Sequence, residues 1–178
     1  LQRDGNRIFG YTAQQVLDYA QALYEKKLLT YPRTDSNYLT EDMRDTLPGL
    51  CEVVVSALPF PVTVSGVDAA RVTDNAKVSD HHALLPTNQM AGAELSALPA
   101  GERNLLTLVT VRLLCAVGEK QVYEDTEAEI TCGGGLFTAK GRVIVSPGFT
   151  EVEQAFLSTL KKKPESDSKE QLGALPPL

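Results

Sequence analysis

The segment TAQQVLDYAQALYEKKLL, residues 12–29, carries the clearest structural signal in the chain. Thr12 followed by Gln15 is the pattern of a capping box, in which each side chain satisfies a backbone donor left free at a helix start. Apolar residues then recur at helical spacing, at positions 16, 17, 20, 23, 24 and 28. The pattern predicts an amphipathic helix packed on a core. It should end before Pro32, because the residue before a proline favours an extended backbone.

The residues that follow this helix predict further helices. Thr40 before two acidic residues indicates a second helix start. Residues 48–66, interrupted by Pro and Gly, leave helix and strand undecided. Residues 102–117 predict a long, nearly all-apolar and buried helix, in which Arg103 and Arg112 need partners.

The pattern changes after Gly118. Residues 122–132 and 136–146 alternate on either side of a run of three glycines, which predicts a β-hairpin. Residues 149–160 indicate a short helix, and residues 161–178 are polar, charged and end in prolines, as in a mobile tail. The predicted fold class is therefore α+β, with a mostly helical unit to about residue 118 and a β-rich segment after it.

Composition excludes several classes of protein. The 178 residues are 43% hydrophobic and 22% charged, and no apolar run reaches the roughly 18–20 residues that a membrane span needs. Seventeen Lys and Arg against 23 Asp and Glu give a net charge of −6, which argues against strong nonspecific binding to phosphate but leaves a local basic site open. The chain starts at Leu1 and shows no signal peptide, so we expect a piece of a longer protein.

The three cysteines are Cys51, Cys115 and Cys132, and none belongs to a C-x-x-C pattern. This spacing argues against structural zinc and against a disulfide framework. We expect a reducing cytoplasm and interpret the three thiols as apolar fillers.

The segment TYPRTDS, residues 30–36, is the most unusual in chemistry. On an extended backbone Tyr31, Arg33 and Asp35 point to the same side. A phenol with a reference pKa near ~10 needs a nearby cation to act as a nucleophile, and the forked guanidinium of arginine matches phosphate oxygens. The alternative is a core tyrosine followed by a surface ion pair between Arg33 and Asp35.

A second cluster, SDHHALLPT at residues 79–87, holds both histidines of the chain. A metal site is a weak interpretation, because adjacent side chains diverge and no third ligand lies at the right spacing. The two remaining interpretations are a turn with solvated histidines and an imidazole that donates a hydrogen bond to a phosphate.

These segments resemble known signatures. YPRTDS at 31–36 resembles the active-site tyrosine motif of type IA DNA topoisomerases. The proline in its second position is similar to the form of this motif in the topoisomerase III branch. Arg71-Val72 and the segment NAKVSDHHALLPT at 75–87 resemble the second signature of that branch, although Leu84 and Leu85 replace the usual isoleucines. ERNL at 102–105 also matches, and together the similarity covers roughly residues 1–150.

The resemblance implies a role for each site residue. Tyr31 matches the tyrosine that attacks a phosphodiester of single-stranded DNA and keeps the 5′ phosphate, leaving a free 3′ hydroxyl. Arg33 matches the arginine expected to place the phosphate. His81 matches the histidine expected to contact the scissile phosphate, and Asp35 matches the carboxylate expected to orient that histidine. Weaker candidates for DNA contacts are Thr34, Ser36, Lys77 and His82.

The resemblance also implies domains and partners. Residues 1–118 match a winged-helix-like tyrosine domain, residues 119–160 a β-rich part of the gate domain, and residues 161–178 a polar tail or connector. The family's Mg²⁺ site lies in an amino-terminal Toprim domain that nothing here matches, so we expect no metal or cofactor within this chain and no activity of the fragment alone. Expected partners are single-stranded DNA and the missing Toprim and gate domains. A monomer in the bacterial cytoplasm, without membrane contact, is expected.

Two alternatives remain. The chain could be a noncatalytic winged-helix module that binds DNA or protein and keeps the motif as scaffold. It could also be a generic α+β domain whose tyrosine packs in the core. Tyr31→Phe separates an enzyme from a binding module, because only the enzyme requires the hydroxyl.

Overall fold

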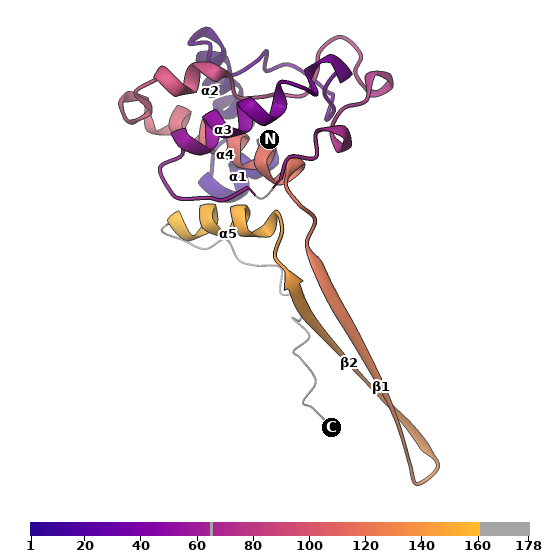
Figure 1. Ribbon diagram of the computed structural model, residues 1–178. Coiled ribbons are helices and arrows are strands. Elements are labelled where there is room, and N and C mark those ends of the chain that lie inside the picture. The colour runs from indigo at the N-terminus through magenta and orange to yellow at the C-terminus, as the bar shows by residue number, and fades with distance from the viewer. Residues whose placement is uncertain (65, 161–178) are drawn as a thin grey trace.

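The computed structural model describes residues 1–64 and 66–160. Within them the chain is mostly helical, with one two-stranded antiparallel sheet, which confirms the predicted α+β class (Figure 1). The predicted tail at 161–178 lies outside the described residues. The helices are α1 (Gln2–Phe9), α2 (Ala13–Glu25), α3 (Leu47–Ala57), α4 (Ala100–Val117) and α5 (Thr150–Thr159), and the strands are β1 (Val122–Cys132) and β2 (Gly135–Ser146). Short 3₁₀ turns lie at Glu41–Met43, Ala69–Arg71, Asn75–Lys77, Asn88–Gly92 and Leu95–Ala97.

Helix α2 starts at the predicted capping box. The Gln15 N–H donates to Thr12 Oγ1 at 3.1 Å, and the Thr12 N–H donates to Gln15 Oε1 at 2.9 Å. The helix ends well before Pro32, as the sequence predicted. Its buried face is narrower than the apolar pattern suggested, because Leu17 and Tyr24 face solvent. The residues of α2 that are buried are Val16, Ala20 and Leu23.

Helix α4 lies at the centre of the core and packs against α2 and α5. The predicted partners of its arginines are present. Arg103 donates to the Ser96 carbonyl at 3.1 Å, and Arg112 bridges Asp4 and Glu153. Glu102, only 7% exposed, pairs with Lys26 at the end of α2. The long apolar helix predicted from the sequence is therefore confirmed, and its charged side chains fasten neighbouring elements.

The prediction for Thr40 was wrong in its details. Only a 3₁₀ turn follows it, and its side chain makes no capping bond. The longer helix α3 begins at Leu47, with Pro48 in its first turn, where a missing N–H costs no helical hydrogen bond. Residues 53–55, undecided from the sequence, are helical because Val54 is buried in the core.

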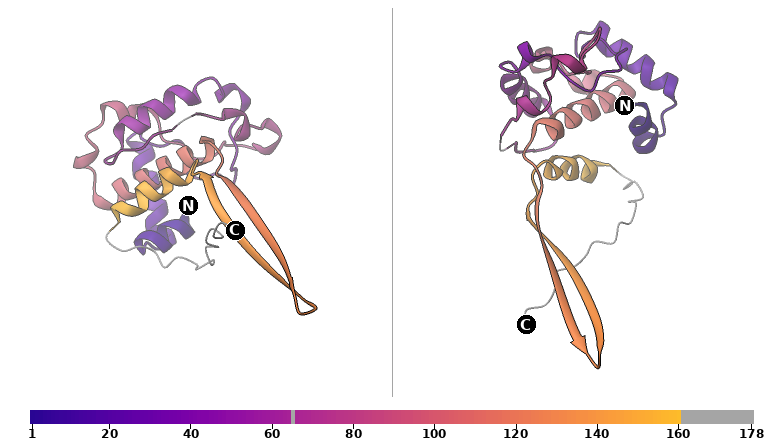
Figure 2. Two further views of the ribbon diagram at one scale, coloured as in Figure 1. Left: turned by 60° about the horizontal axis from the view of Figure 1, so that its bottom comes forward. Right: turned by 90° about the vertical axis from the view of Figure 1, so that its right-hand side faces the viewer.

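Strands β1 and β2 form the predicted hairpin, paired from Val122↔Ser146 to Cys132↔Gly135. The hairpin extends away from the helices in every view (Figures 1 and 2), and nearly every residue of both strands is exposed. Large apolar side chains face solvent on it, namely Val122, Tyr123, Ile130, Leu136, Phe137, Val143, Ile144 and Val145.

The cysteines differ in environment. Cys51 is buried in α3, where burial raises the pKa of its thiol to about 11. Cys115 is partly buried, and burial likewise raises its pKa to about 11. Cys132 is exposed at the end of β1. Interpretation as an apolar filler therefore holds for Cys51 and is wrong for Cys132.

The hairpin joins the helices at a tight crossing. The Arg71 guanidinium donates to the Ala116 carbonyl at 2.6 Å and to the Gly118 carbonyl. These two hydrogen bonds cap the carboxyl end of α4. The Phe149 N–H donates to the Glu119 carbonyl at 2.8 Å. Beside it Gly148 has φ +50, and a Cβ there would lie 2.5 Å from the Lys120 backbone.

Gly148→Ala should therefore lower the free energy of unfolding by about 2–4 kcal/mol. Overpacking costs on the order of 1–3 kcal/mol, and a left-handed backbone conformation costs a residue with a Cβ on the order of 1–2 kcal/mol. Gly10→Ala is the matched control, because Gly10 has φ +73 but nothing within 4 Å of the added carbon. Urea unfolding of both variants measures the difference. Equal losses at the two positions would show that the crossing has room for a methyl group.

None of the helices in the two described ranges is long and apolar enough to cross a membrane.

Candidate active site

The segment that carries Tyr31 is fixed to two others that lie far from it in sequence. At its start, Leu29 forms an antiparallel bridge with Pro86, and the Thr30 N–H donates to the Leu85 carbonyl at 2.9 Å. At its end, Leu39 forms a parallel bridge with Thr73. Both predicted motifs, around Tyr31 and His81, thereby come together in one site.

The Tyr31 ring lies close to two other rings. Its centroid is 4.6 Å from that of His81, with the planes tilted by 47°. The Tyr24 ring also packs against it in a T-shaped arrangement, with centroids 5.5 Å apart. Tyr31 is partly exposed and outside the hydrophobic core, which argues against the interpretation of Tyr31 as a core tyrosine.

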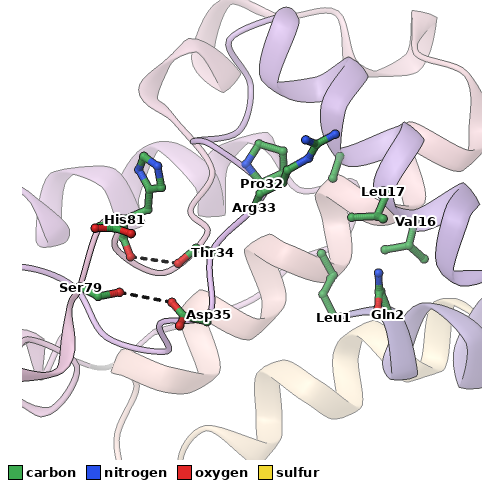
Figure 3. A pocket seen from close by; sticks show the side chains of 12 residues that line it. Leu1, Gln2, Val16, Leu17, Pro32, Arg33, Thr34, Asp35, Ser79 and His81 are labelled. Carbon is green, nitrogen blue, oxygen red and sulfur yellow. Dashed lines mark hydrogen bonds between the residues drawn. The ribbon is translucent and has the colours of Figure 1, made fainter.

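A cavity of about 650 Å³ lies beside His81 and is lined by Arg33, Asp35 and His81, among others (Figure 3). Tyr31 is not among the lining residues. Arg33 is exposed, and in Figure 3 its side chain extends away from His81. None of the ion pairs found within residues 1–64 and 66–160 involves Arg33. The predicted surface pair of Arg33 with Asp35 is thus not formed, and the guanidinium is available to an anion.

Asp35 faces a different neighbour from the one predicted. Its carboxylate lies 3.5 Å from the Ser79 hydroxyl (Figure 3), the outer limit of a hydrogen bond. An orienting contact between Asp35 and the imidazole of His81 therefore stays a prediction.

Thr34 and Ser36 make hydrogen bonds within the chain. The Thr34 hydroxyl donates to the His81 carbonyl at 2.9 Å and accepts from the Ser36 N–H at 3.1 Å. The Ser36 hydroxyl lies 3.0 Å from the Lys77 carbonyl and accepts from the Tyr38 N–H. Both hydroxyls hold the tyrosine segment against the histidine segment, and their predicted contacts with DNA are untested.

Lys77 and His82 lie at the edges of the site. The Lys77 ammonium is 3.1 Å from Asp74 and 4.2 Å from the centroid of the Tyr38 ring. Hydrogen bonding between the pair raises the pKa of Lys77 and lowers that of Asp74. His82 Nδ1 lies 2.7 Å from the Ala83 carbonyl; since a carbonyl only accepts, Nδ1 carries the proton. Lys77 is exposed and Asp74 is partly exposed, so the ammonium can exchange this carboxylate for a phosphate.

The described residues offer no place for a metal ion: within 1–64 and 66–160 no group of three or more His, Cys, Asp or Glu side chains could hold one. They therefore do not fit a Mg²⁺ site, and the metal stays a prediction for another part of a longer protein.

Sequence reasoning missed two residues of this site. The apolar pattern placed Tyr24 on the buried face of α2, yet it is 40% exposed and its ring packs against that of Tyr31. Thr30 carried no pattern of its own, although its hydroxyl accepts from the Leu85 N–H at 2.9 Å. Together the arrangement sets a phenol beside an imidazole, next to a cavity lined by a guanidinium that forms no ion pair with the described residues. This arrangement suits attack on a phosphate ester and stabilisation of the charge that develops on it.

Comparisons with known proteins agree with this chemistry. A family model described as DNA topoisomerase matches residues 1–177. The chain is 39% identical over 158 residues to DNA topoisomerase 3 of Bacillus licheniformis, with 85% of this chain and 22% of that protein covered. It is 38% identical over 182 residues to DNA topoisomerase 3 of Shouchella clausii, with 95% of this chain and 25% of that protein covered. The chain thus spans about a quarter or less of the length of these curated relatives.

The fold has a match among solved structures. Full-length topoisomerase I from Thermotoga maritima superposes with a TM-score of 0.57 at 20% identity, covering 99% of this chain and 28% of that one. At this identity the match concerns the fold alone. The extent of the family match and the identity to proteins named DNA topoisomerase 3 show that the chain belongs to the type IA DNA topoisomerases.

Proposed function

We propose that this chain is the tyrosine-bearing segment of a topoisomerase III-like enzyme that cleaves single-stranded DNA through a 5′-phosphotyrosyl intermediate, passes a strand and religates. The observation that carries the proposal is the contact of Tyr31 with His81, whose rings lie 4.6 Å apart although each belongs to a different sequence motif. Family membership supplies the reaction class, and this contact supports Tyr31 as the nucleophile.

In the proposed reaction the Tyr31 hydroxyl loses its proton and its oxygen bonds to a backbone phosphorus of the DNA. The bond from that phosphorus to the 3′ oxygen breaks, and the 3′ oxygen takes up a proton. One phosphodiester is exchanged for another, so the 3′ hydroxyl can reverse the step without ATP. Arg33 would bind the phosphate oxygens through its forked donors, and His81 would donate a hydrogen bond to them.

The exposed hairpin supports a larger assembly. Its large apolar side chains face solvent from both strands, and we propose that further parts of a longer polypeptide, including the rest of the β-rich gate domain, cover them. The helical unit to residue 118 would be the tyrosine domain; α5, at the end of the β-rich segment, folds back against α4.

The Mg²⁺ of the intact enzyme would be bound in a Toprim domain elsewhere in the longer polypeptide. We also propose a monomeric enzyme of the bacterial cytoplasm; the relatives that the chain resembles are bacterial.

Labelled oligonucleotides test the proposal. The intact polypeptide is incubated with Mg²⁺ and single-stranded DNA labelled at one end, and the reaction is stopped with denaturant. A 3′-end label should travel with the protein, whereas a 5′-end label should leave on a shortened strand. The opposite distribution would refute a 5′-phosphotyrosyl bond, and binding without any adduct would favour the noncatalytic module.

A further inference from the structure

Thr30 occupies an unusual position in the pairing between the tyrosine segment and the histidine segment. We propose that Thr30 is the residue that positions Tyr31 for attack. In the last pair of hydrogen bonds between the two segments, the Thr30 hydroxyl accepts the bond that the Thr30 carbonyl would accept in a regular ladder. The inference rests on the proposed role of Tyr31 and adds a residue that acts through it.

The geometry of the rung is specific. In a regular antiparallel rung, two facing residues exchange two backbone hydrogen bonds. Here the Thr30 N–H donates to the Leu85 carbonyl at 2.9 Å, but the Leu85 N–H donates to Thr30 Oγ1, also at 2.9 Å. The side chain therefore completes the rung, and the Thr30 carbonyl is released from it.

Release of the carbonyl lets the backbone leave the pairing at this residue. The chain bends at Thr30, and Pro32 follows, which has no N–H to continue a ladder. Tyr31 thus departs from the paired segment at a fixed point. A backbone carbonyl acceptor at Thr30 would hold the next peptide in line with the ladder and turn the Tyr31 ring away from its present direction.

The other half of the rung fixes the histidine. Leu85 is 4% exposed and belongs to the segment that carries His81. The same segment is held a second time, where the Thr34 hydroxyl donates to the His81 carbonyl at 2.9 Å. Two threonine hydroxyls on either side of Tyr31 therefore set the spacing between its ring and that of His81. Loss of the Thr30 hydroxyl also leaves the Leu85 N–H without its acceptor, which favours a rearranged rung.

The chain contains a matched control in the same pairing. Thr87 donates its N–H to the Leu28 carbonyl at 3.1 Å, and its hydroxyl donates to the Lys27 carbonyl. Thr87 thus also uses both its backbone and its side chain, but at the end of the pairing that is remote from Tyr31. A variant at Thr87 weakens the pairing without touching the rung that aims the tyrosine.

The test compares Thr30→Val, Thr30→Ser and Thr87→Val in the intact polypeptide, by single-turnover formation of the covalent adduct with a labelled single-stranded oligonucleotide. Thr30→Val should slow the rate at saturating DNA by about 10- to 100-fold, because a misplacement near 1 Å has an effect of that size. The apparent Kd for the oligonucleotide should stay close to wild type. Thr30→Ser keeps the acceptor and should restore most of the rate, and Thr87→Val should cleave nearly as fast as wild type.

Several outcomes would overturn the proposal: a wild-type rate in Thr30→Val, an equal loss in Thr87→Val, or no recovery in Thr30→Ser. Thermal unfolding checks that each variant folds. Should Thr30→Val not fold, Thr30→Ala removes the same acceptor with a smaller side chain and has to show the same loss of rate. Absence of an adduct from wild type refutes the function proposed for Tyr31 and this inference with it, whereas a wild-type adduct with an unaffected Thr30→Val refutes the inference alone.

Discussion

Tyr31→Phe in the intact enzyme should abolish the covalent adduct with single-stranded DNA and leave binding of the strand nearly unchanged. The substitution removes one oxygen atom and keeps the ring. The packing against the rings of His81 and Tyr24, with centroid distances of 4.6 and 5.5 Å, should therefore persist. Without the hydroxyl no phosphotyrosyl bond can form at this position. Denaturing electrophoresis of the labelled adduct, with a filter-binding measurement of affinity, separates the two effects.

Tyr24→Phe is the matched control for this prediction. Tyr24 is a neighbouring phenol, 40% exposed and in contact with the same ring, so its variant should still form the adduct. An adduct of normal yield from Tyr31→Phe would show that another residue attacks the DNA. If wild type and Tyr31→Phe bind the strand equally well and neither forms an adduct, the noncatalytic module becomes the better account.

Arg33→Ala should lower the rate of adduct formation by about 10²–10³-fold, the size of effect seen when one donor to a developing anionic charge is removed. Arg33 is exposed, lines the cavity beside His81, and enters none of the ion pairs found in the described ranges. Its removal should therefore leave the stability of the fold within about 0.5 kcal/mol, as for other exposed side chains. Single-turnover cleavage and urea unfolding of the same samples measure both quantities.

Two further variants sharpen the Arg33 test. Arg33→Lys keeps the charge but loses the forked geometry, so it should recover only part of the rate. Arg7→Ala removes an exposed arginine of α1 that lies outside the cavity lining, and it should cleave like wild type. A loss in Arg7→Ala as large as in Arg33→Ala would point to general electrostatic attraction of DNA in place of a specific phosphate contact.

The parts of the fold that local sequence determines could be predicted. The capping box at Thr12 and Gln15 placed the start of α2, and alternation around three glycines placed the hairpin. Helix α1 gave no such signal, because its only buried residue is Gly5, which packs against Val16 of another helix. The outward direction of Tyr24 and the exposure of both faces of the hairpin likewise depend on which surfaces other elements cover.

The candidate site divides in the same way. The motif resemblance named Tyr31, Arg33 and His81 as candidate site residues. Their arrangement in space depends on contacts between segments that are distant in sequence. The Thr30 hydroxyl is an example, because its partner Leu85 lies in another motif and no spacing rule links the two. Simple alternation put Arg33 and Asp35 on the face of Tyr31, whereas in the structure they line a cavity that Tyr31 does not.

The chemical identity of the linkage between protein and DNA tests the proposed role of Tyr31 most directly. The adduct of the intact enzyme with a single-stranded oligonucleotide is trapped with denaturant, digested with nuclease and trypsin, and analysed by tandem mass spectrometry. We expect a nucleotide joined through its 5′ phosphate to the tryptic peptide of residues 28–33, with fragmentation placing it on Tyr31. A nucleotide on any other residue, or one joined through a 3′ phosphate, would contradict the proposed role.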